Sequence, residues 1–265
     1  MSGSLEQVRS VLFLPASNPS AVGHARESAA DLVVLDLEDA VKREDKGGAR
    51  AAAVEAAAGT WPMPVAIRIN GAGSEWHSLD IDAVARSNAN YAVLPRAGSA
   101  HLVHEVAEAI GKPLMAMVET AAGVLTSAPI ARECAALIAG TNDLRADLRV
   151  PTGNDRSAIA ASLQMILLAA RSAGIPAFDG VFNALDDWEG FAAECAEGRG
   201  LGFDGKSLIH PKQIDACNRA FSPSEAELAR ARRLVDAFGG GAERFEGEMI
   251  ERMHVETARR LLDRA

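Results

Sequence analysis

The 265-residue sequence predicts an α/β fold, a (β/α)8 barrel with a C-terminal helical extension. Short apolar runs alternate along the chain with helix-like segments. Most of these runs are apolar at consecutive positions, which is typical of parallel strands that are covered on both faces by crossover helices. The chain is 48% hydrophobic but only 5% aromatic, and its abundant Ala, Val and Leu suit helices packed closely on a buried sheet.

Eight apolar runs are candidate strands, at residues 11–14, 32–35, 65–69, 91–94, 114–118, 136–139, 175–178 and 207–209. Segments between them have the apolar spacing of amphipathic helices, for example 45–58, 100–110 and 157–173. Eight β/α units that close on themselves are the simplest architecture for this pattern.

The chain is predicted to have one barrel domain, residues 1–236, followed by a helical tail, residues 237–265. No linker or low-complexity tract interrupts residues 1–235, whereas three consecutive glycines at 239–241 form a flexible joint. An amphipathic helix is predicted over 248–264. We expect this tail to pack on a neighbouring subunit.

Charge and composition argue against several classes of protein. A net charge of −9 gives no general attraction to nucleic acid or to an anionic membrane. The three cysteines are widely spaced and form no CxxC motif, so we expect neither a disulfide framework nor a thiolate zinc site, and we expect a reducing cytoplasm. Neither a signal peptide nor a membrane-spanning stretch is expected.

Polar residues follow the apolar runs, and in a (β/α)8 barrel the C-terminal ends of the strands carry the active site. In chain order they are Asp36, Glu38, Asp39, Arg68, Asn70, Arg96, Glu119, Asp143, Asp179 and His210. Several carboxylates that converge on one barrel mouth would repel one another unless a cation lies among them. A hard cation with oxygen ligands is the natural occupant.

Glu119 and Asp143 come from adjacent predicted strands. Together they could hold one Mg2+, or alternatively Mn2+, from one side and leave positions for water and substrate oxygens. Each carboxylate could instead be a helix N-cap or an ion-pair partner.

Arg68 lies in an otherwise apolar strand, so its guanidinium needs carboxylate partners from a ligand or from Asp36 or Glu38. Residues two apart on a strand point the same way, so Asp36 and Glu38 are predicted to point inward and Asp39 outward. The two inward carboxylates could hold metal-bound waters, orient Arg68, or form structural pairs with basic residues.

Two further features have alternative interpretations. Lys46 and Arg50 are four residues apart on a predicted helix and could receive phosphates at the barrel rim, or could simply form a solvated helix face. His210, which precedes a proline, could be a general base or a hydrogen-bonded structural residue.

Several motifs occur in a fixed order along nearly the whole chain. They are RSVLF at 9–13 with Pro15, LDLEDAV at 35–41, RIN at 68–70, LPR at 94–96, VET at 118–120, GTNDL at 140–144, FDGV at 178–181 and GFDGKSLIHPKQI at 202–214. In these motifs the chain resembles the citrate lyase β-subunit and malyl-CoA lyase group of the HpcH/HpaI aldolase family. The resemblance implies a trimeric or hexameric TIM barrel that binds Mg2+ and a CoA or acyl-carrier thioester.

The resemblance also implies site residues and a reaction. Glu119 and Asp143 would hold the metal, and Arg68 would contact the substrate carboxylate and carbonyl. The reaction would cleave or form a carbon–carbon bond in a 3-hydroxyacyl thioester, with acyl-CoA and a small 2-oxo acid as products. Asp36 and Glu38 are further candidates for catalysis because of their predicted place beside Arg68, and not because of the resemblance.

The CoA phosphates would then meet Lys46 and Arg50, with Arg9 as another candidate at the rim.

Malyl-CoA-type members end in a motif resembling G-x-M-(I/V)-D-x-P, whose Asp enters a neighbouring subunit's site as an acid or base. This chain has Glu251 at that position and no proline. A Glu reaches one methylene further and could still move a proton.

The sequence departs from the family at one more position, because Arg96 stands where a lysine is usual.

Two other functions remain open. One is a pyruvate-type aldolase that acts on free aldehydes, and the other is a non-catalytic acyl-CoA-binding protein.

Overall fold

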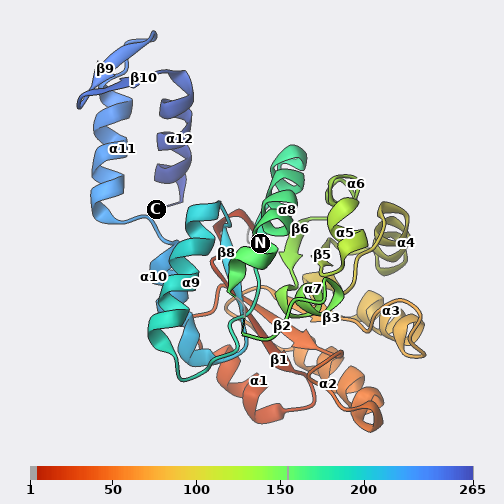
Figure 1. Cartoon of the computed structure of the whole chain (residues 1–265). Coiled ribbons are helices and arrows are strands. Elements are labelled where there is room, and N and C mark those ends of the chain that lie inside the picture. Colours follow the sequence, from red (N-terminus) through yellow and green to blue (C-terminus); the bar gives the residue numbers. More distant parts are fainter. Residues whose placement is uncertain (1–4, 154, 265) are drawn as a thin grey trace. The chain divides into compact units, whose positions relative to one another are not determined.

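The computed structural model of the chain describes residues 5–153 and 155–264. In the first of two compact units, which ends at Ala220, eight parallel strands close into a barrel in sequence order (Figure 1). The strands are β1 (Ser10–Pro15), β2 (Leu32–Asp36), β3 (Val65–Arg68), β4 (Tyr91–Leu94), β5 (Leu114–Val118), β6 (Ala136–Ala139), β7 (Ala177–Asp179) and β8 (Gly205–Leu208). The predicted (β/α)8 barrel is confirmed, and each predicted apolar run overlaps one strand.

Helices surround the barrel (Figure 1). They are α1 (Pro19–Arg26), α2 (Lys46–Ala58), α3 (His77–Arg86), α4 (Ala100–Ile110), α5 (Ala121–Leu125), α6 (Ser127–Ala131), α7 (Thr141–Asp147), α8 (Ala160–Ala173), α9 (Trp188–Leu201) and α10 (Ile214–Phe221), with short 3-10 turns η1 (Leu5–Gln7), η2 (Arg43–Asp45), η3 (Arg156–Ile159) and η4 (Pro211–Gln213). Local sequence sets their ends: α4 begins where the Ser99 side chain accepts the Leu102 N–H and ends at Gly111, which has φ 65°. Within the described ranges, every helix is too short or too polar to cross a bilayer.

Strand alternation decides which side chains enter the barrel. The interior is an apolar cluster contributed by alternate strand residues, among them Val34, Ala66, Met117 and Phe178. Continuing the same alternation from Val34, Ala66 and Met117 brings Asp36, Arg68 and Glu119 to the inner face at the C-terminal ends of their strands. The register pairs Asp36 directly with Arg68 on the neighbouring strand.

The second compact unit begins at Phe221. It contains α11 (Glu225–Ala237), an antiparallel hairpin of β9 (Glu243–Phe245) and β10 (Glu248–Ile250), and α12 (Arg252–Asp263). Its own small core is formed by Ala231, Leu234, Ile250, Val255 and Ala258.

This unit differs from the predicted tail in two respects. The contacts divide the chain after residue 220 and not after 236, because α11 packs against α12. The last helix starts at Arg252 and not at 248, because residues 248–250 pair with β9. Packing of this unit on a neighbouring subunit stays a prediction.

Candidate active site

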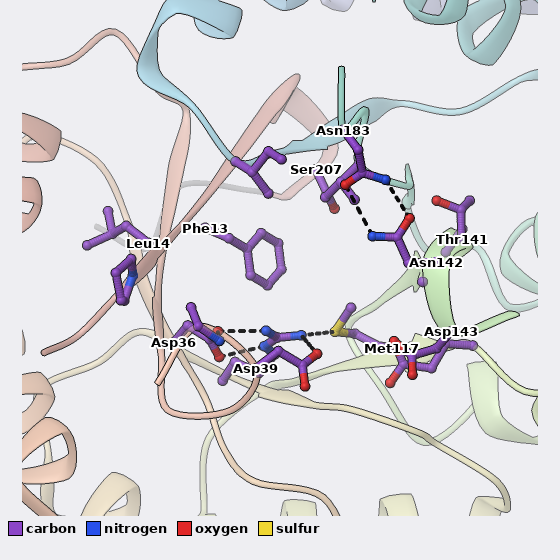
Figure 2. Close-up of a pocket in the computed structure, with 18 residues that line it drawn as sticks. Phe13, Leu14, Asp36, Asp39, Met117, Thr141, Asn142, Asp143, Asn183 and Ser207 are labelled. Atoms are coloured by element: carbon purple, nitrogen blue, oxygen red, sulfur yellow. Dashed lines mark hydrogen bonds and ion pairs between the residues drawn. The ribbon is translucent and has the colours of Figure 1, made fainter. Parts of the chain in front are cut away.

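A pocket of about 340 Å3 opens at the C-terminal ends of the strands, where the sequence analysis expected it (Figure 2). Its charged lining residues are Asp36, Asp39, Arg68, Glu119 and Asp143. In the close-up, Asp36, Asp39, Met117 and Asp143 lie along the lower part of the pocket, and Asn142, Asn183 and Ser207 lie above them (Figure 2). The pocket therefore has an acidic side and a neutral, hydrogen-bonding side.

Arg68 is the centre of the acidic side. Its Nε and Nη2 each donate to one Asp36 carboxylate oxygen, both at 2.6 Å. Its Nη1 lies 3.1 Å from Glu38 Oε2 and 3.6 Å from Asp39 Oδ2. The guanidinium carbon lies 5.3 Å from the centre of the Phe13 ring. Of the interpretations left open for Arg68, the structure shows pairing with the carboxylates of the protein itself.

The turn after β2 explains why a third carboxylate joins this group. Asp36 accepts the backbone N–H groups of Glu38 at 2.8 Å and Ala40 at 3.0 Å, so the chain turns immediately after the strand. Strand alternation no longer applies beyond Asp36. The prediction that Asp39 points away from the site is therefore wrong, because Asp39 lines the pocket.

Glu38 lies beside this cluster, with 15% of its side chain exposed. Its Oε2 has no hydrogen-bond partner among the described residues. Arg68 Nη1 is close enough to Oε2 for an ion pair, but the two atoms do not form a hydrogen bond. Burial raises the pKa of Glu38 to about 8, the charges of Asp39, Glu119 and Asp36 add to the increase, and Arg68 opposes it.

Glu119 and Asp143 lie in the same pocket. Glu119 is 3% exposed, and its Oε1 accepts the backbone N–H of Arg96 at 2.6 Å. A Cβ atom at Gly140 would lie 2.2 Å from Glu119 Oε2, so only glycine leaves room for this carboxylate. Neither acid is a helix cap, since Thr120 caps α5 and Gly140 occupies the N-cap position of α7.

The electrostatics of these two acids fit a bound cation. Burial raises the pKa of Glu119 to about 7, the Arg96 N–H partly offsets this, and the negative charge of Asp143 raises it further. Mg2+ commonly takes one or two protein carboxylates and keeps several waters. Among the described residues, no group of three His, Cys, Asp or Glu side chains forms a complete metal site, so other ligands would have to be water or substrate. Glu119 and Asp143 would hold the ion.

Lys46 is not a free rim lysine. It is 7% exposed, and its Nζ donates to the carbonyl oxygens of Leu37 at 2.7 Å and Glu38 at 2.6 Å and to Asn70 Oδ1 at 2.7 Å. The ammonium group therefore holds the turn after β2 that carries Glu38. Its predicted contact with CoA phosphates stays a prediction.

Arg50 and Arg9 are also paired within the protein. Arg50 Nε lies 2.6 Å from Asp80 Oδ1, and the Asp80 side chain is fully buried, so this helix face is not simply solvated. Arg9 precedes β1 and pairs with Asp31 at 2.8 Å. The N-terminal end of β1 is the opposite end of the barrel from the pocket, which places Arg9 away from the site.

The polar residues after β7 and β8 have structural contacts. Phe178 faces the barrel core, so Asp179 points outward, where Arg156 and Lys206 bind it. His210 Nδ1 accepts the N–H of Lys212 at 3.1 Å and caps η4, which is the structural alternative left open for it.

Glu251 lies in the second unit at the N-terminus of α12, and its backbone N–H donates to His254 Nδ1 at 2.9 Å. Its role as an acid or base stays a prediction.

The sequence analysis also missed the amide pair of Asn142 and Asn183, which exchange hydrogen bonds of 3.3 and 2.7 Å at the pocket. Asn183 lies in a loop without an apolar pattern, so no sequence signal pointed to this pair.

Known proteins resemble this chain over most of its length. The HpcH/HpaI aldolase/citrate lyase family matches residues 9–211. The chain is 40% identical to a (3S)-malyl-CoA thioesterase of Cereibacter sphaeroides (strain KD131 / KCTC 12085), over 100% of this chain and 97% of that protein. It is 33% identical to the citrate lyase subunit beta of Leuconostoc mesenteroides subsp. cremoris, over 96% of this chain and 92% of that protein.

Among solved structures, CitE from Mycobacterium tuberculosis in complex with magnesium, acetoacetate and coenzyme A superposes with a TM-score of 0.87. The two are 33% identical, and the match covers 98% of this chain and 99% of the other. The matches extend over the barrel and over the residues that line its pocket. The chain belongs to the HpcH/HpaI aldolase/citrate lyase family.

Proposed function

We propose that the protein is a Mg2+-dependent carbon–carbon lyase that cleaves or forms a 3-hydroxyacyl-CoA thioester. The main observation in support is that one pocket combines two acids, Glu119 with its raised pKa and Asp143, with the fixed guanidinium of Arg68. The M. tuberculosis relative binds magnesium, a small oxo acid and coenzyme A, which is the ligand set that this pocket would need.

The chain's own residues suggest how cleavage would proceed. Bound Mg2+ would supply Lewis acidity toward substrate oxygens, with Glu119 and Asp143 as its protein ligands. A base removes the 3-hydroxyl proton, the bond between C2 and C3 breaks, and the electron pair passes to the thioester carbonyl as an enolate, which is then protonated. Asp36 holds Arg68 so that Nη1 can donate to an oxygen that gains charge in this step. Glu38 is one candidate base, and Glu251 supplied by a neighbouring subunit is the other.

Hydrolysis of the thioester is a second candidate. The observation that favours it is the 40% identity over the whole chain to a (3S)-malyl-CoA thioesterase. In that reaction, water attacks the thioester carbonyl, and free CoA leaves with the hydroxy acid intact. The two candidates share a substrate class and differ in the bond that breaks.

One assay separates them. The purified protein is incubated with Mg2+ and malyl- or citramalyl-CoA, whose cleavage gives a 2-oxo acid, while 2-oxo acid, acyl-CoA and free thiol are quantified together. Equal amounts of 2-oxo acid and acyl-CoA without free thiol support the lyase. Free thiol without 2-oxo acid supports the thioesterase.

Controls test the metal assignment in the same assay. EDTA and the variants Glu119→Gln and Asp143→Asn should each abolish turnover, whereas Arg132→Gln, an exposed change before β6, should not. Full activity in both acid variants contradicts the assignment. If the wild type binds Mg2+ but produces nothing from any of these thioesters, the reaction is wrong, and a free-aldehyde aldolase or a non-catalytic binding protein is favoured instead.

We also propose that the assembly is a trimer or hexamer in which the second unit packs on a neighbouring subunit. The thioester would be carried by CoA or by an acyl-carrier protein. Lys46 and Arg50 would contact the phosphates of the carrier group. Size-exclusion chromatography with light scattering tests the assembly. Product formation from the CoA ester alone tests whether a carrier protein is needed.

A further inference from the structure

Arg96 contacts both acids to which the proposed function assigns the metal. Its backbone N–H donates to Glu119 Oε1 at 2.6 Å, and its Nη1 lies 3.5 Å from Asp143 Oδ1. Nothing in the proposed reaction uses Arg96 directly. Its position between the two acids requires a separate explanation.

The backbone of Arg96 adopts a conformation that favours glycine. Its φ is 50°, in the left-handed region that non-glycine residues seldom occupy. The next N–H, from Ala97, donates to Met117 O at 2.9 Å, so the segment after β4 stays tied to β5. In this conformation the Arg96 N–H is directed at Glu119 Oε1 and fixes that oxygen in place.

The side chain of Arg96 acts separately from its backbone. The Arg96 and Asp143 side chains are 56% and 41% exposed, and 3.5 Å is long for an ion pair, so the attraction between them is weak and easily exchanged. A divalent cation held by Glu119 and Asp143 would compete with the guanidinium for the same carboxylate. The two positive charges would also repel each other.

We propose that Arg96 is a positioning residue that sets the cation affinity of this site. Its N–H fixes Glu119, while its guanidinium serves as a replaceable counter-ion for Asp143 and weakens cation binding. This inference rests on the proposed function in assuming that Glu119 and Asp143 hold the metal. The backbone contribution survives substitution by any residue except proline, whereas the side-chain contribution depends on the positive charge.

The test is a titration of the metal-free protein with MgCl2 by calorimetry, and with Mn2+ by electron paramagnetic resonance, without substrate. Arg96→Gln and Arg96→Gly remove the charge and keep the N–H, so both should bind Mg2+ about three- to fivefold more tightly than the wild type. Arg96→Lys keeps the charge and should stay within about twofold of the wild type. Raising the ionic strength should shrink the difference, because the charges are exposed.

Matched variants separate the possible failures. Arg132→Gln removes one exposed positive charge before β6, at the opposite end of the barrel, and should leave the affinity unchanged. Glu119→Gln should abolish binding. One result would contradict this inference alone: Glu119→Gln abolishes binding, while Arg96→Gln keeps its circular dichroism spectrum and binds Mg2+ no more tightly than the wild type. In that case the role of Arg96 is wrong, and the assignment of the metal to Glu119 and Asp143 is kept. If the wild type binds no Mg2+, or Glu119→Gln binds normally, the proposed metal site falls as well.

Discussion

The ends of β7 and β8 and the ends of β2 to β5 both carry buried charge, but the charge is balanced in only one of these regions. Behind β7 and β8, Lys206 Nζ donates to Asp179 at 3.0 Å and to Glu194 at 2.7 Å, and Arg156 adds two bonds to Asp179 of 2.7 and 2.9 Å. Burial alone would raise the pKa of Asp179, yet Lys206 and Arg156 lower it below its usual value. The two cations there pair with the two less exposed acids, and Arg156 Nε also lies 3.7 Å from the more exposed Glu197.

On the pocket side, negative charge exceeds positive charge. Burial and neighbouring acids raise the pKa of Glu38 to about 8 and that of Glu119 to about 7, despite the nearby Arg68. A folded protein retains such unfavourable charge where ligands or chemistry need it. The balanced cluster is therefore expected to support the fold, and the unbalanced one to support binding and turnover.

The largest expected effect comes from breaking the balanced cluster. Lys206 and Asp179 are fully buried, so Lys206→Met leaves the buried Asp179 and the partly exposed Glu194 short of a cation. We expect a loss of about 3–5 kcal/mol in the free energy of unfolding, measured by urea denaturation. The exposed Lys42→Met is the matched control and should change stability by less than about 0.5 kcal/mol. Equal stability of the two variants would remove the distinction between the regions.

The corresponding change on the pocket side should affect turnover more than stability. Arg68→Lys keeps a positive charge among Asp36, Glu38 and Asp39 but loses the two parallel bonds to Asp36. We expect kcat/KM on the substrate to fall about 100-fold, since removing one fixed donor to a developing oxyanion has an effect of this size. The free energy of unfolding should change by less than about 2 kcal/mol. A large loss of stability with normal turnover would assign Arg68 to the fold.

The pH dependence of stability should differ between the two regions. The pKa of Glu38 is about 8 in the folded protein against 4.5 in the absence of a shift, so the folded state binds the proton more tightly between these values. Stability therefore falls as pH rises, by about 2 kcal/mol from pH 6 to pH 8 in metal-free protein. The lowered pKa of Asp179 acts in the opposite direction, with stability lost only below its usual range.

Urea denaturation of the wild type and of Glu38→Gln at several pH values measures this. The variant should lose the part of the decline that Glu38 causes, because its amide does not titrate, and keep the part expected from Glu119, whose pKa of about 7 lies in the same range. A wild-type curve that is flat over this range, or an identical slope in the variant, would show that Glu38 is not an unbalanced acid.

The residues predicted well from the sequence are those that strand periodicity controls. Consecutive apolar runs marked the eight strands, and the two-residue alternation correctly pointed Asp36 inward. Asp39 was misassigned because the strand ends three residues earlier, at Asp36. The contact of Arg96 with Glu119 depends on a positive φ, which local sequence pattern does not reveal in an arginine.

Contacts between side chains that are far apart in the sequence could also not be predicted from local patterns. Lys46 and Arg50 share a helix face as predicted, but their partners Asn70 and Asp80 come from later in the chain. The hairpin that shortens the last helix is likewise decided by pairing between residues 243–245 and 248–250. Helical periodicity alone does not exclude such a pairing.

The smallest expected effect concerns His210, which follows β8 and caps η4. Its ring Nδ1 accepts the Lys212 backbone N–H, and the His210 backbone N–H donates to Gln213 Oε1 at 3.2 Å. His210→Ala should therefore cost about 1 kcal/mol of stability, as loss of an N-cap does, while His210→Asn keeps the cap and most of that stability. Because His210 lies outside the lining of the pocket, kcat/KM and its pH profile should stay within about twofold of the wild type in both variants. A tenfold or greater loss of turnover in both, without loss of stability, would make His210 the general base and would extend the reactive side of the barrel mouth to β8.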